Sequence, residues 1–324
     1  MKRYLLNKNK TVILDEVQKI PSILDEVHRL IENEGLQFVL TGSSARKLKQ
    51  KGVNLLAGRA LTFNFFPLTA FELSEDFDLK FALRFGMLPK VWGKSEPKRF
   101  LKSYVKTYLK EEIFQEGLTR SLPAFSRFLE AASFSQGSLL NLSAVAQDCA
   151  VPRKSVENYF EILEDILLGV RVPCFTMHAK RKVVTHPKFY FFDTGVFRSL
   201  RPKGPLDLDE NLDGIALETL VFQELRALNA YFEFDYAISF WRTESVSEFE
   251  VDFILYGEKG LKAFEVKKTS KLRSSDFRGL KAFLEDYPMA QPYLLYGGER
   301  ELREGPIKIL PISQFFKSAR QLLE

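Results

Sequence analysis

The sequence is poor in cysteine and histidine, and it has no long apolar run. Its 324 residues include two cysteines, Cys149 and Cys174, which give no disulfide framework and indicate a reducing compartment. The three histidines are scattered, and none has a cysteine or histidine partner at the spacing of a zinc site. No run approaches the roughly 18 apolar residues of a membrane-spanning helix, and no apolar signal-peptide region follows Met1. The sequence therefore predicts a cytoplasmic protein without a membrane contact.

A phosphate-binding loop is also missing. None of the 18 glycines completes the pattern G-x-x-x-x-G-K-[ST], and the stretch from Met1 to Lys10 is too short for the strand and loop that this pattern needs. The net charge of +5 and the pI near 8.9 permit contact with nucleic acid without requiring it. Because 45% of the residues are hydrophobic, the chain has enough apolar side chains for the cores of two or three domains.

The sequence near the N-terminus nevertheless has a strand pattern that ends in two carboxylates. The apolar run Val12-Ile13-Leu14 ends in the carboxylate pair Asp15 and Glu16. In P-loop ATPases, a hydrophobic strand ends in an aspartate that holds Mg²⁺, and an adjacent glutamate polarises the attacking water. The pattern predicts Asp15 as a metal ligand and Glu16 as a catalytic residue. The alternative is that the pair only caps the next helix.

A second apolar strand at 38–40 follows a segment with helical periodicity. Alternating strands and helices predict a parallel α/β sheet, in which ligands bind beyond the carboxyl ends of the strands. Thr41, Ser43 and Ser44 would then share an edge with Asp15, where hydroxyl groups could sense the γ-phosphate of a nucleotide. The alternative is that this segment forms only a turn.

The middle of the chain has the pattern of a DNA-binding module. Residues 67–120 are expected to form a helical lid, and in 121–202 Asn141 is predicted to cap a short helix that a turn separates from a longer one. A basic hairpin follows, and this arrangement is typical of a winged helix. The alternative is a module for protein contacts whose basic residues are solvated. The predicted DNA contacts are Arg153, Lys154, Lys180, Arg181 and Lys182.

The strongest chemical pattern lies in the last segment, 203–324. Period-two alternation places Glu265 and Lys267 on one face of a strand, with Asp252 on the preceding strand and Glu218 on the helix before it. Carboxylates with a lysine are what a Mg²⁺-dependent phosphodiesterase needs. The pattern predicts these four residues as catalytic, with Asp252 and Glu265 as metal ligands. The alternative is an exposed strand edge with a simple ion pair.

Several strings of residues resemble a known family. They are Leu14–Pro21, Leu40–Arg46, Leu56–Ala60, Tyr190–Gly195, Glu250–Phe253 and Glu265–Lys267. On these strings the chain resembles prokaryotic AAA-type ATPases of the AAA_14 kind that carry a C-terminal domain of unknown function, DUF4143. The resemblance covers nearly the whole sequence.

The resemblance implies both an architecture and residue roles. It implies a truncated AAA core at 1–66, a winged helix at 121–202 and an α/β domain similar to PD-(D/E)xK nucleases at 203–324, with the helical lid expected from the residue pattern at 67–120. Asp15 and Glu16 would be the Walker B pair, and Ser43 or Ser44 would hold a sensor position. Arg59 matches an arginine that approaches a nucleotide, in its own or a neighbouring subunit, although a surface arginine is an equal alternative.

We therefore predict a cytoplasmic, DNA-associated α/β protein of the AAA type that lacks the Walker A segment. ATP and Mg²⁺ are the ligands expected from the family, but without a phosphate loop Asp15 and Glu16 are expected to bind ATP poorly. Either the sequence starts late, or the protein is a natural remnant. A Mg²⁺-dependent DNA nuclease and a non-enzymatic DNA- or partner-binding scaffold stay open as other functions, and a homo-oligomer is one option for the assembly.

Overall fold

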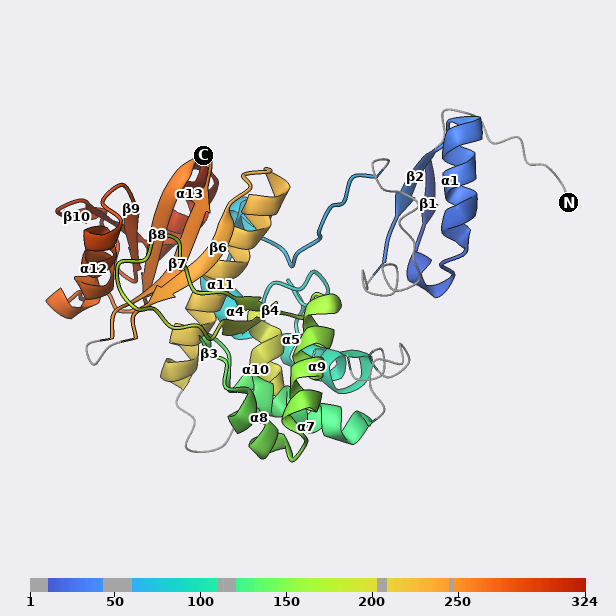
Figure 1. Cartoon of the computed structure of the whole chain (residues 1–324), viewed down its shortest axis with the longest axis horizontal. Helices are drawn as coiled ribbons and strands as arrows, with labels where there is room; N and C mark the ends of the chain where they lie inside the picture. Colours follow the sequence, from blue (N-terminus) through green and yellow to red (C-terminus); the bar gives the residue numbers. More distant parts are fainter. Residues whose placement is uncertain (1–10, 43–59, 110–112, 114–120, 203–208, 245–247) are drawn as a thin grey trace, which may run out of the picture. The chain divides into compact units, whose positions relative to one another are not determined.

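The structure of the protein is a computed structural model that describes residues 11–42, 60–109, 113, 121–202, 209–244 and 248–324. Within these ranges it is an α/β protein with parallel and antiparallel strand pairs, as predicted. It consists of two compact units, residues 1–63 with 160–168 and residues 64–159 with 169–324 (Figure 1). No helix in the described ranges is long and apolar enough to cross a membrane. The predicted boundaries at 66, 120 and 202 stay predictions.

The smaller unit contains the predicted strand, helix and strand. Its elements are β1 (Thr11–Leu14), η1 (Val17–Lys19), α1 (Ile23–Glu34) and β2 (Gln37–Leu40). The two strands pair in parallel, as the alternating pattern indicates. Leu24 and Val27 are buried on α1, which ends at Gly35 with a φ of 63°, a value that glycine adopts without strain. Ile13 and Val39 lie exposed, and the residues on the other face of the two strands are partly buried.

The larger unit begins with helices and a small sheet. Its elements up to residue 200 are α3 (Ala70–Leu73), η2 (Ser74–Asp76), α4 (Leu79–Phe85), α5 (Pro97–Ser103), η3 (Tyr104–Leu109), α7 (Leu122–Ser133), β3 (Ser138–Leu139), α8 (Leu142–Cys149), the first part of α9 (Arg153–Asp165), β4 (Gly169–Val172), β5 (Lys188–Phe191) and α10 (Thr194–Leu200). The three strands pair antiparallel in the order β3-β5-β4. The predicted cap of α8 is confirmed, because Asn141 Oδ1 accepts a hydrogen bond of 3.1 Å from the backbone N–H of Ala144.

The helices α4 and α10 cross with no space for a side chain between their backbones. A Cβ atom at Gly195 would overlap the carbonyl oxygen of Phe85, so only glycine fits there. Asp193 accepts hydrogen bonds from the backbone N–H of Val196 at 3.0 Å and of Met87 at 2.7 Å. This one buried carboxylate therefore caps α10 and fixes the chain that leaves α4.

The last part of the larger unit is a six-stranded mixed sheet with helices on both faces (Figure 1). The elements are α11 (Asp209–Tyr231), β6 (Ala237–Arg242), β7 (Glu250–Gly257), β8 (Gly260–Lys267), η4 (Ser274–Phe277), α12 (Arg278–Asp286), β9 (Gln291–Tyr296), β10 (Leu302–Glu304), β11 (Ile307–Pro311) and α13 (Ile312–Leu323). The strand order is β10-β11-β9-β8-β7-β6. Apolar side chains of α11 and α13 pack in one core and those of α12 in another.

A β-bulge interrupts the alternation of β7 near its start. Ser239 of β6 pairs with Ile254, whereas Trp241 pairs with Val251, so β7 carries one more residue than its partner over this stretch. Val251 and Ile254 consequently belong to the same apolar core although three positions separate them. A bulge of this kind re-aims side chains, and the residues that it re-aims here include Asp252.

A buried glutamate on α11 makes the stability of the fold depend on pH. Glu224 accepts hydrogen bonds from the backbone N–H of Ala70 at 2.8 Å and of Phe71 at 3.1 Å, and burial raises its pKa from 4.5 to about 7. The folded state therefore binds more protons than the unfolded state between these two values. The stability that protonated Glu224 contributes is fully present below about pH 4.5 and is lost as the pH rises through about 7.

In the wild type, the unfolding free energy should fall between pH 5 and pH 8 as Glu224 loses its proton. We predict that Glu224→Gln makes this fall smaller, by up to about 3 kcal/mol, because the neutral side chain needs no proton. Urea unfolding at a series of pH values measures this. Glu75→Gln, at an exposed position of the neighbouring segment, is the matched control and should keep the pH dependence of the wild type. An unchanged pH dependence in Glu224→Gln would contradict the prediction.

Candidate functional site

The carboxyl ends of β1 and β2 bring two predicted residues together. Thr41 Oγ1 donates a hydrogen bond to Asp15 Oδ1, and the backbone N–H of Glu16 lies 3.4 Å from Thr41 Oγ1. Parallel pairing of the strands fixes this arrangement, because Leu14 and Leu40 are direct partners in the register. The expected shared edge is thus present for Asp15 and Thr41. Ser43, Ser44 and Arg59 lie outside the described residues.

The Glu16 carboxylate has partners of its own. Glu16 has a φ of 57°, in the left-handed region, and its Oε2 accepts a hydrogen bond of 2.7 Å from Gln18 Nε2. Lys19 Nζ lies 3.6 Å from the same oxygen. The side chain predicted to polarise water is therefore held by its own 3₁₀ turn.

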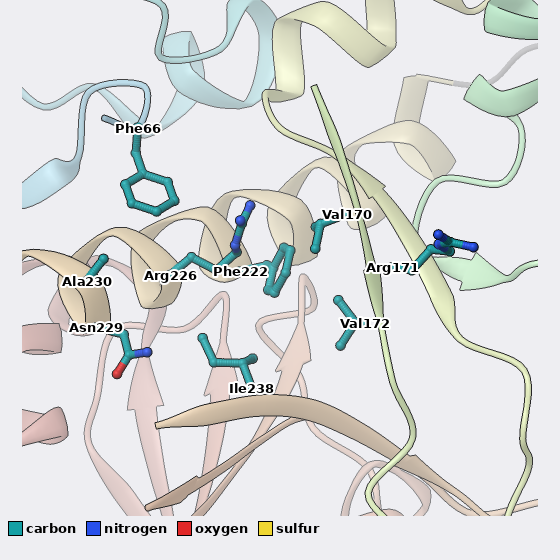
Figure 2. Close-up of a pocket in the computed structure, with 9 residues that line it drawn as sticks. All are labelled: Phe66, Val170, Arg171, Val172, Phe222, Arg226, Asn229, Ala230 and Ile238. Atoms are coloured by element: carbon teal, nitrogen blue, oxygen red, sulfur yellow. The ribbon is translucent and has the colours of Figure 1, made fainter. Parts of the chain in front are cut away.

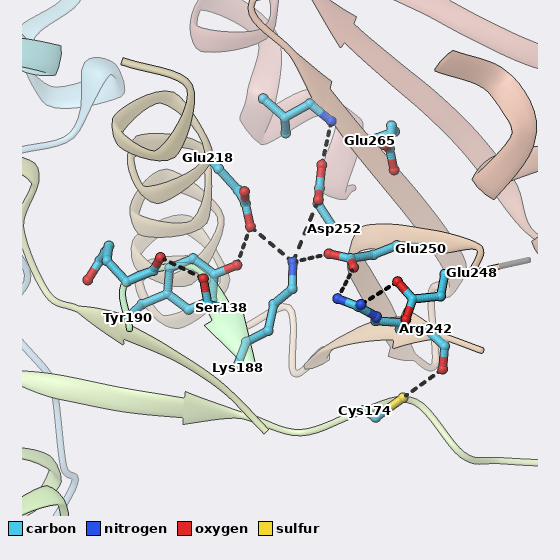
Figure 3. A network of polar contacts seen from close by, with 12 residues as sticks. Ser138, Cys174, Lys188, Tyr190, Glu218, Arg242, Glu248, Glu250, Asp252 and Glu265 are labelled. Carbon is cyan, nitrogen blue, oxygen red and sulfur yellow. Dashed lines mark hydrogen bonds and ion pairs between the residues drawn. The ribbon is translucent and has the colours of Figure 1, made fainter. Parts of the chain in front are cut away.

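The second candidate site is a cluster of carboxylates around Lys188, shown in Figure 3. Lys188 Nζ lies 2.5 Å from Glu250 Oε1, 3.2 Å from Glu218 Oε1 and 3.7 Å from Asp252 Oδ1. Only 2% of the lysine is exposed, so its ammonium group has left water and depends on these carboxylates. The cluster joins three elements, because Lys188 begins β5, Glu218 lies on α11, and the other two residues lie on β7.

The remaining predicted residues lie beside this cluster. Asp252 Oδ2 accepts a hydrogen bond of 2.8 Å from the backbone N–H of Val266, which ties β7 to β8 where their regular pairing stops. Lys267 Nζ lies 2.6 Å from Glu265 Oε1. Of the four residues that the sequence selects, Glu218 and Asp252 thus contact Lys188, whereas Glu265 and Lys267 form an ion pair of their own.

Burial and like charge set the protonation of the carboxylates. Burial raises the pKa of Asp252 well above its usual value, and the charges of Glu265 and Glu218 raise it further. Burial also raises the pKa of Glu265 to about 7, although Lys267 opposes this shift. For Lys188, burial lowers the pKa, but the carboxylates, with Glu218 first, outweigh it and raise the pKa well above 10.5. The lysine is therefore charged at every physiological pH.

Sequence reasoning missed the central residue of this site. The prediction did not include Lys188, its partner Glu250, or Tyr190. The Tyr190 hydroxyl donates a hydrogen bond to Glu218 Oε1. One signal was present, because Lys188 is a single charged residue in an otherwise apolar run at 187–192. A lysine at a buried strand position needs a carboxylate partner.

The cluster does not fit a divalent metal ion. The Lys188 ammonium occupies the space between Glu218, Glu250 and Asp252, where a cation bound by these carboxylates would lie. Within the described ranges, no group of three or more histidine, cysteine, aspartate or glutamate side chains has the geometry to hold a metal. Of the two predicted metal ligands, Asp252 faces the ammonium group of Lys188 and Glu265 faces that of Lys267.

The basic residues of the predicted wing contact the C-terminal part of the chain. Lys180 Nζ donates to the carbonyl oxygen of Glu285 at 3.2 Å, and Arg181 Nε lies 3.5 Å from Asp286 Oδ1. Lys182 Nζ lies 2.9 Å from Glu244 Oε2. The hairpin chain is also bonded to β6 through backbone hydrogen bonds. These three residues therefore have protein partners, whereas Arg153 and Lys154, at the start of α9, are exposed.

Three family models match the chain in succession. Residues 1–74 match an AAA domain (AAA_14), residues 76–209 match a domain of unknown function (DUF8612), and residues 213–315 match a domain of unknown function (DUF4143). An uncharacterized protein of Methanocaldococcus jannaschii, MJ1544, is 23% identical over 297 residues. This match covers 83% of the chain and 64% of the relative, so the chain spans less than two thirds of the relative's length.

Two solved structures show only distant likeness. Can2 from Sulfobacillus thermosulfidooxidans, in complex with cyclic tetra-adenylate, is 11% identical with a TM-score of 0.28, and the match covers 94% of this chain and 80% of Can2. Protein VC1899 from Vibrio cholerae is 13% identical with a TM-score of 0.27, covering 97% of this chain and 90% of VC1899. Both TM-scores are too low to indicate a shared arrangement.

The N-terminal match gives the chain an AAA domain, and the described strands of that domain, β1 and β2, pair in parallel. The chain therefore combines an N-terminal AAA domain with a C-terminal DUF4143 domain, as the resemblance of its sequence implies.

We predict that Lys188→Met destabilises the protein by about 3–5 kcal/mol near pH 8, because it leaves buried carboxylates without their cation. The destabilisation should shrink near pH 6, where Asp252 and Glu265 take up protons more readily. Urea unfolding measures both values. Lys182→Met removes an exposed ion pair and is the matched control, with an expected change of about 1 kcal/mol or less.

The same variant tests the assignment of the central cation. Mn²⁺ should stabilise Lys188→Met, in which the carboxylates can face a metal, and should leave the wild type unchanged. Equal stabilisation of both proteins by Mn²⁺ would show that Lys188 does not exclude the metal.

Proposed function

We propose that the chain is the nucleotide-binding part of an AAA-family protein, with the edge formed by Asp15 and Thr41 facing Mg²⁺ and ATP. The observation that carries this proposal is the hydrogen bond between these two side chains at the ends of neighbouring parallel strands. Ligands of parallel α/β sheets bind at this edge. The match of residues 1–74 to an AAA domain supports the same assignment.

Within this proposal the residues have distinct roles. Asp15 would hold Mg²⁺, which offsets phosphate charge when it is bound with ATP. Thr41 would orient Asp15 through the hydrogen bond they share. The Glu16 carboxylate is held by Gln18 and Lys19, which favours nucleotide binding over hydrolysis in this conformation. The proposed activity is therefore binding with slow or no turnover.

A winged helix is our proposal for the middle of the chain. The order α7, β3, α8, α9, β4, β5 and the antiparallel pairing of the strands support it. In such modules the start of the second helix approaches DNA, and exposed Arg153 and Lys154 lie there. We propose that these two residues carry DNA contacts, while Lys180, Arg181 and Lys182 serve mainly to fix the hairpin.

For the C-terminal domain we propose a nuclease-like arrangement that does not cleave DNA. Asp252, Glu265 and Lys267 lie together as a Mg²⁺-dependent nuclease would require, which favours that alternative. The Lys188 ammonium opposes it, because it neutralises the carboxylates that a metal would need. The domain then works as a binding scaffold, and a fold can keep such residues after losing the reaction.

We predict that the chain binds ATP weakly and only with Mg²⁺, and that Asp15→Ala removes this binding by removing the metal ligand. Titration with a fluorescent ATP analogue, with and without Mg²⁺, measures it. Asp25→Ala, at an exposed position of α1, is the matched control and should bind as the wild type does. Mg²⁺-dependent binding that survives in Asp15→Ala would place the nucleotide elsewhere.

DNA binding gives an independent prediction. Replacing Arg153 and Lys154 by alanine should reduce the slope of log K against log salt by about 0.9 for each phosphate that is no longer neutralised. Fluorescence anisotropy with a duplex at several salt concentrations measures the slope. The pair Lys180→Ala and Lys182→Ala should change it less, because protein groups already engage both lysines. A larger change in the slope for the Lys180 and Lys182 pair than for the Arg153 and Lys154 pair would assign DNA binding to the hairpin.

A further inference from the structure

A cavity of about 250 Å³ lies between α11, β4, β6 and the segment that leads into α3 (Figure 2). Six of the nine residues that line it have apolar side chains, and the other three are Arg171, Arg226 and Asn229. The side chains that matter for its chemistry are Phe66, Val170, Val172, Phe222, Arg226 and Ile238. None of them belongs to the ATP edge or to the carboxylate cluster. The cavity is therefore a separate feature of the larger unit.

Arg226 is the charged group of this cavity that lacks a counter-ion. Among the described residues, no carboxylate forms an ion pair or a hydrogen bond with it, and its neighbours are the rings of Phe66 at 5.3 Å and Phe222 at 5.5 Å. Arg198, another arginine of the same unit, is paired with Asp213 at 3.0 Å. Burial lowers the pKa of Arg226 to about 10, because the guanidinium group has given up much of its hydration.

The remaining polar groups of the cavity leave Arg226 as the anchor for a ligand. Asn229 uses both ends of its amide on the backbone of Tyr236, at 2.9 Å each. Val170 and Val172 face the cavity, whereas Arg171 between them points to the other side of β4 (Figure 2). A single guanidinium group therefore faces an apolar space.

We propose that this cavity binds a small monocarboxylate with an apolar body, held through its carboxylate by Arg226. The guanidinium fork matches a carboxylate with two parallel hydrogen bonds, and one positive charge balances one negative charge. A phosphate dianion would bring a second negative charge, and the other arginine of the lining, Arg171, points to the other side of β4 (Figure 2). The volume lies just below the range of drug-sized sites, so a single ring or a short branched chain fits.

Phenylacetate is a suitable probe, with neutral phenylacetamide and phenyl phosphate as comparison ligands. We expect phenylacetate to bind the full chain with at least about tenfold higher affinity than either comparison ligand, as measured by ligand-observed NMR and calorimetry. Arg226→Met keeps the length of the side chain and should weaken phenylacetate binding by at least about tenfold. Arg303→Met, at an exposed position of β10, is the matched control and should bind as the wild type does.

A second variant keeps the test decisive if Arg226→Met does not fold. Ile238→Phe should fill the cavity from β6, retain Arg226 and abolish binding. Circular dichroism establishes that each variant is folded. Absence of phenylacetate binding to the wild type, equal binding of phenylacetamide, tighter binding of phenyl phosphate, or full binding in both folded variants would each overturn the proposal.

Discussion

The contact between the Lys188 ammonium and its carboxylates is the interaction on which the larger unit depends. Three acidic side chains gather there, and burial makes their negative charge costly unless a cation is near. Because Lys188 starts β5 whereas its partners lie on α11 and β7, neutralising the charge also joins the small sheet to the large one. Breaking such a pair is far more damaging than the pair itself is stabilising, since one partner keeps an unpaired buried charge.

Because the carboxylate cluster depends on Lys188, its likeness to a nuclease site does not by itself give it the chemistry of a nuclease. Asp252, Glu265 and Lys267 match the pattern that predicts a nuclease from the sequence, and Asp252 lies beside the β-bulge of β7. The chemistry of a nuclease also requires an exchangeable metal ion at the centre. A lysine from a neighbouring strand cannot leave as a metal can, because its chain is part of the fold. Function therefore depends on the residue that faces the carboxylates as much as on the carboxylates.

Whether a contact could be predicted from the sequence depends on how far apart its residues lie along the chain. Parallel strands place Asp15 beside Thr41, period-two alternation places Glu265 beside Lys267, and Asn141 caps its helix within three residues. The partner of Lys188 on α11 is 30 positions away, and Arg181 meets its acceptor on α12 at a separation of 101. Local patterns reveal that such side chains are charged but not which groups they meet. The bulge at Asp252 likewise follows from the pairing of two strands and leaves no mark in one strand alone.

The position of Lys188 in the chain also determines what a fragment of this protein would be. A fragment that begins after β5, such as residues 209–324, would carry every carboxylate of the cluster and none of its central charge. Metal binding or DNA cleavage measured on that fragment would describe a site that the whole chain does not contain. During synthesis of the whole chain, the ribosome completes β5, which carries Lys188, before α11 and β7, which carry the carboxylates. Lys188 is therefore already synthesised when each acidic residue of the cluster is added to the chain.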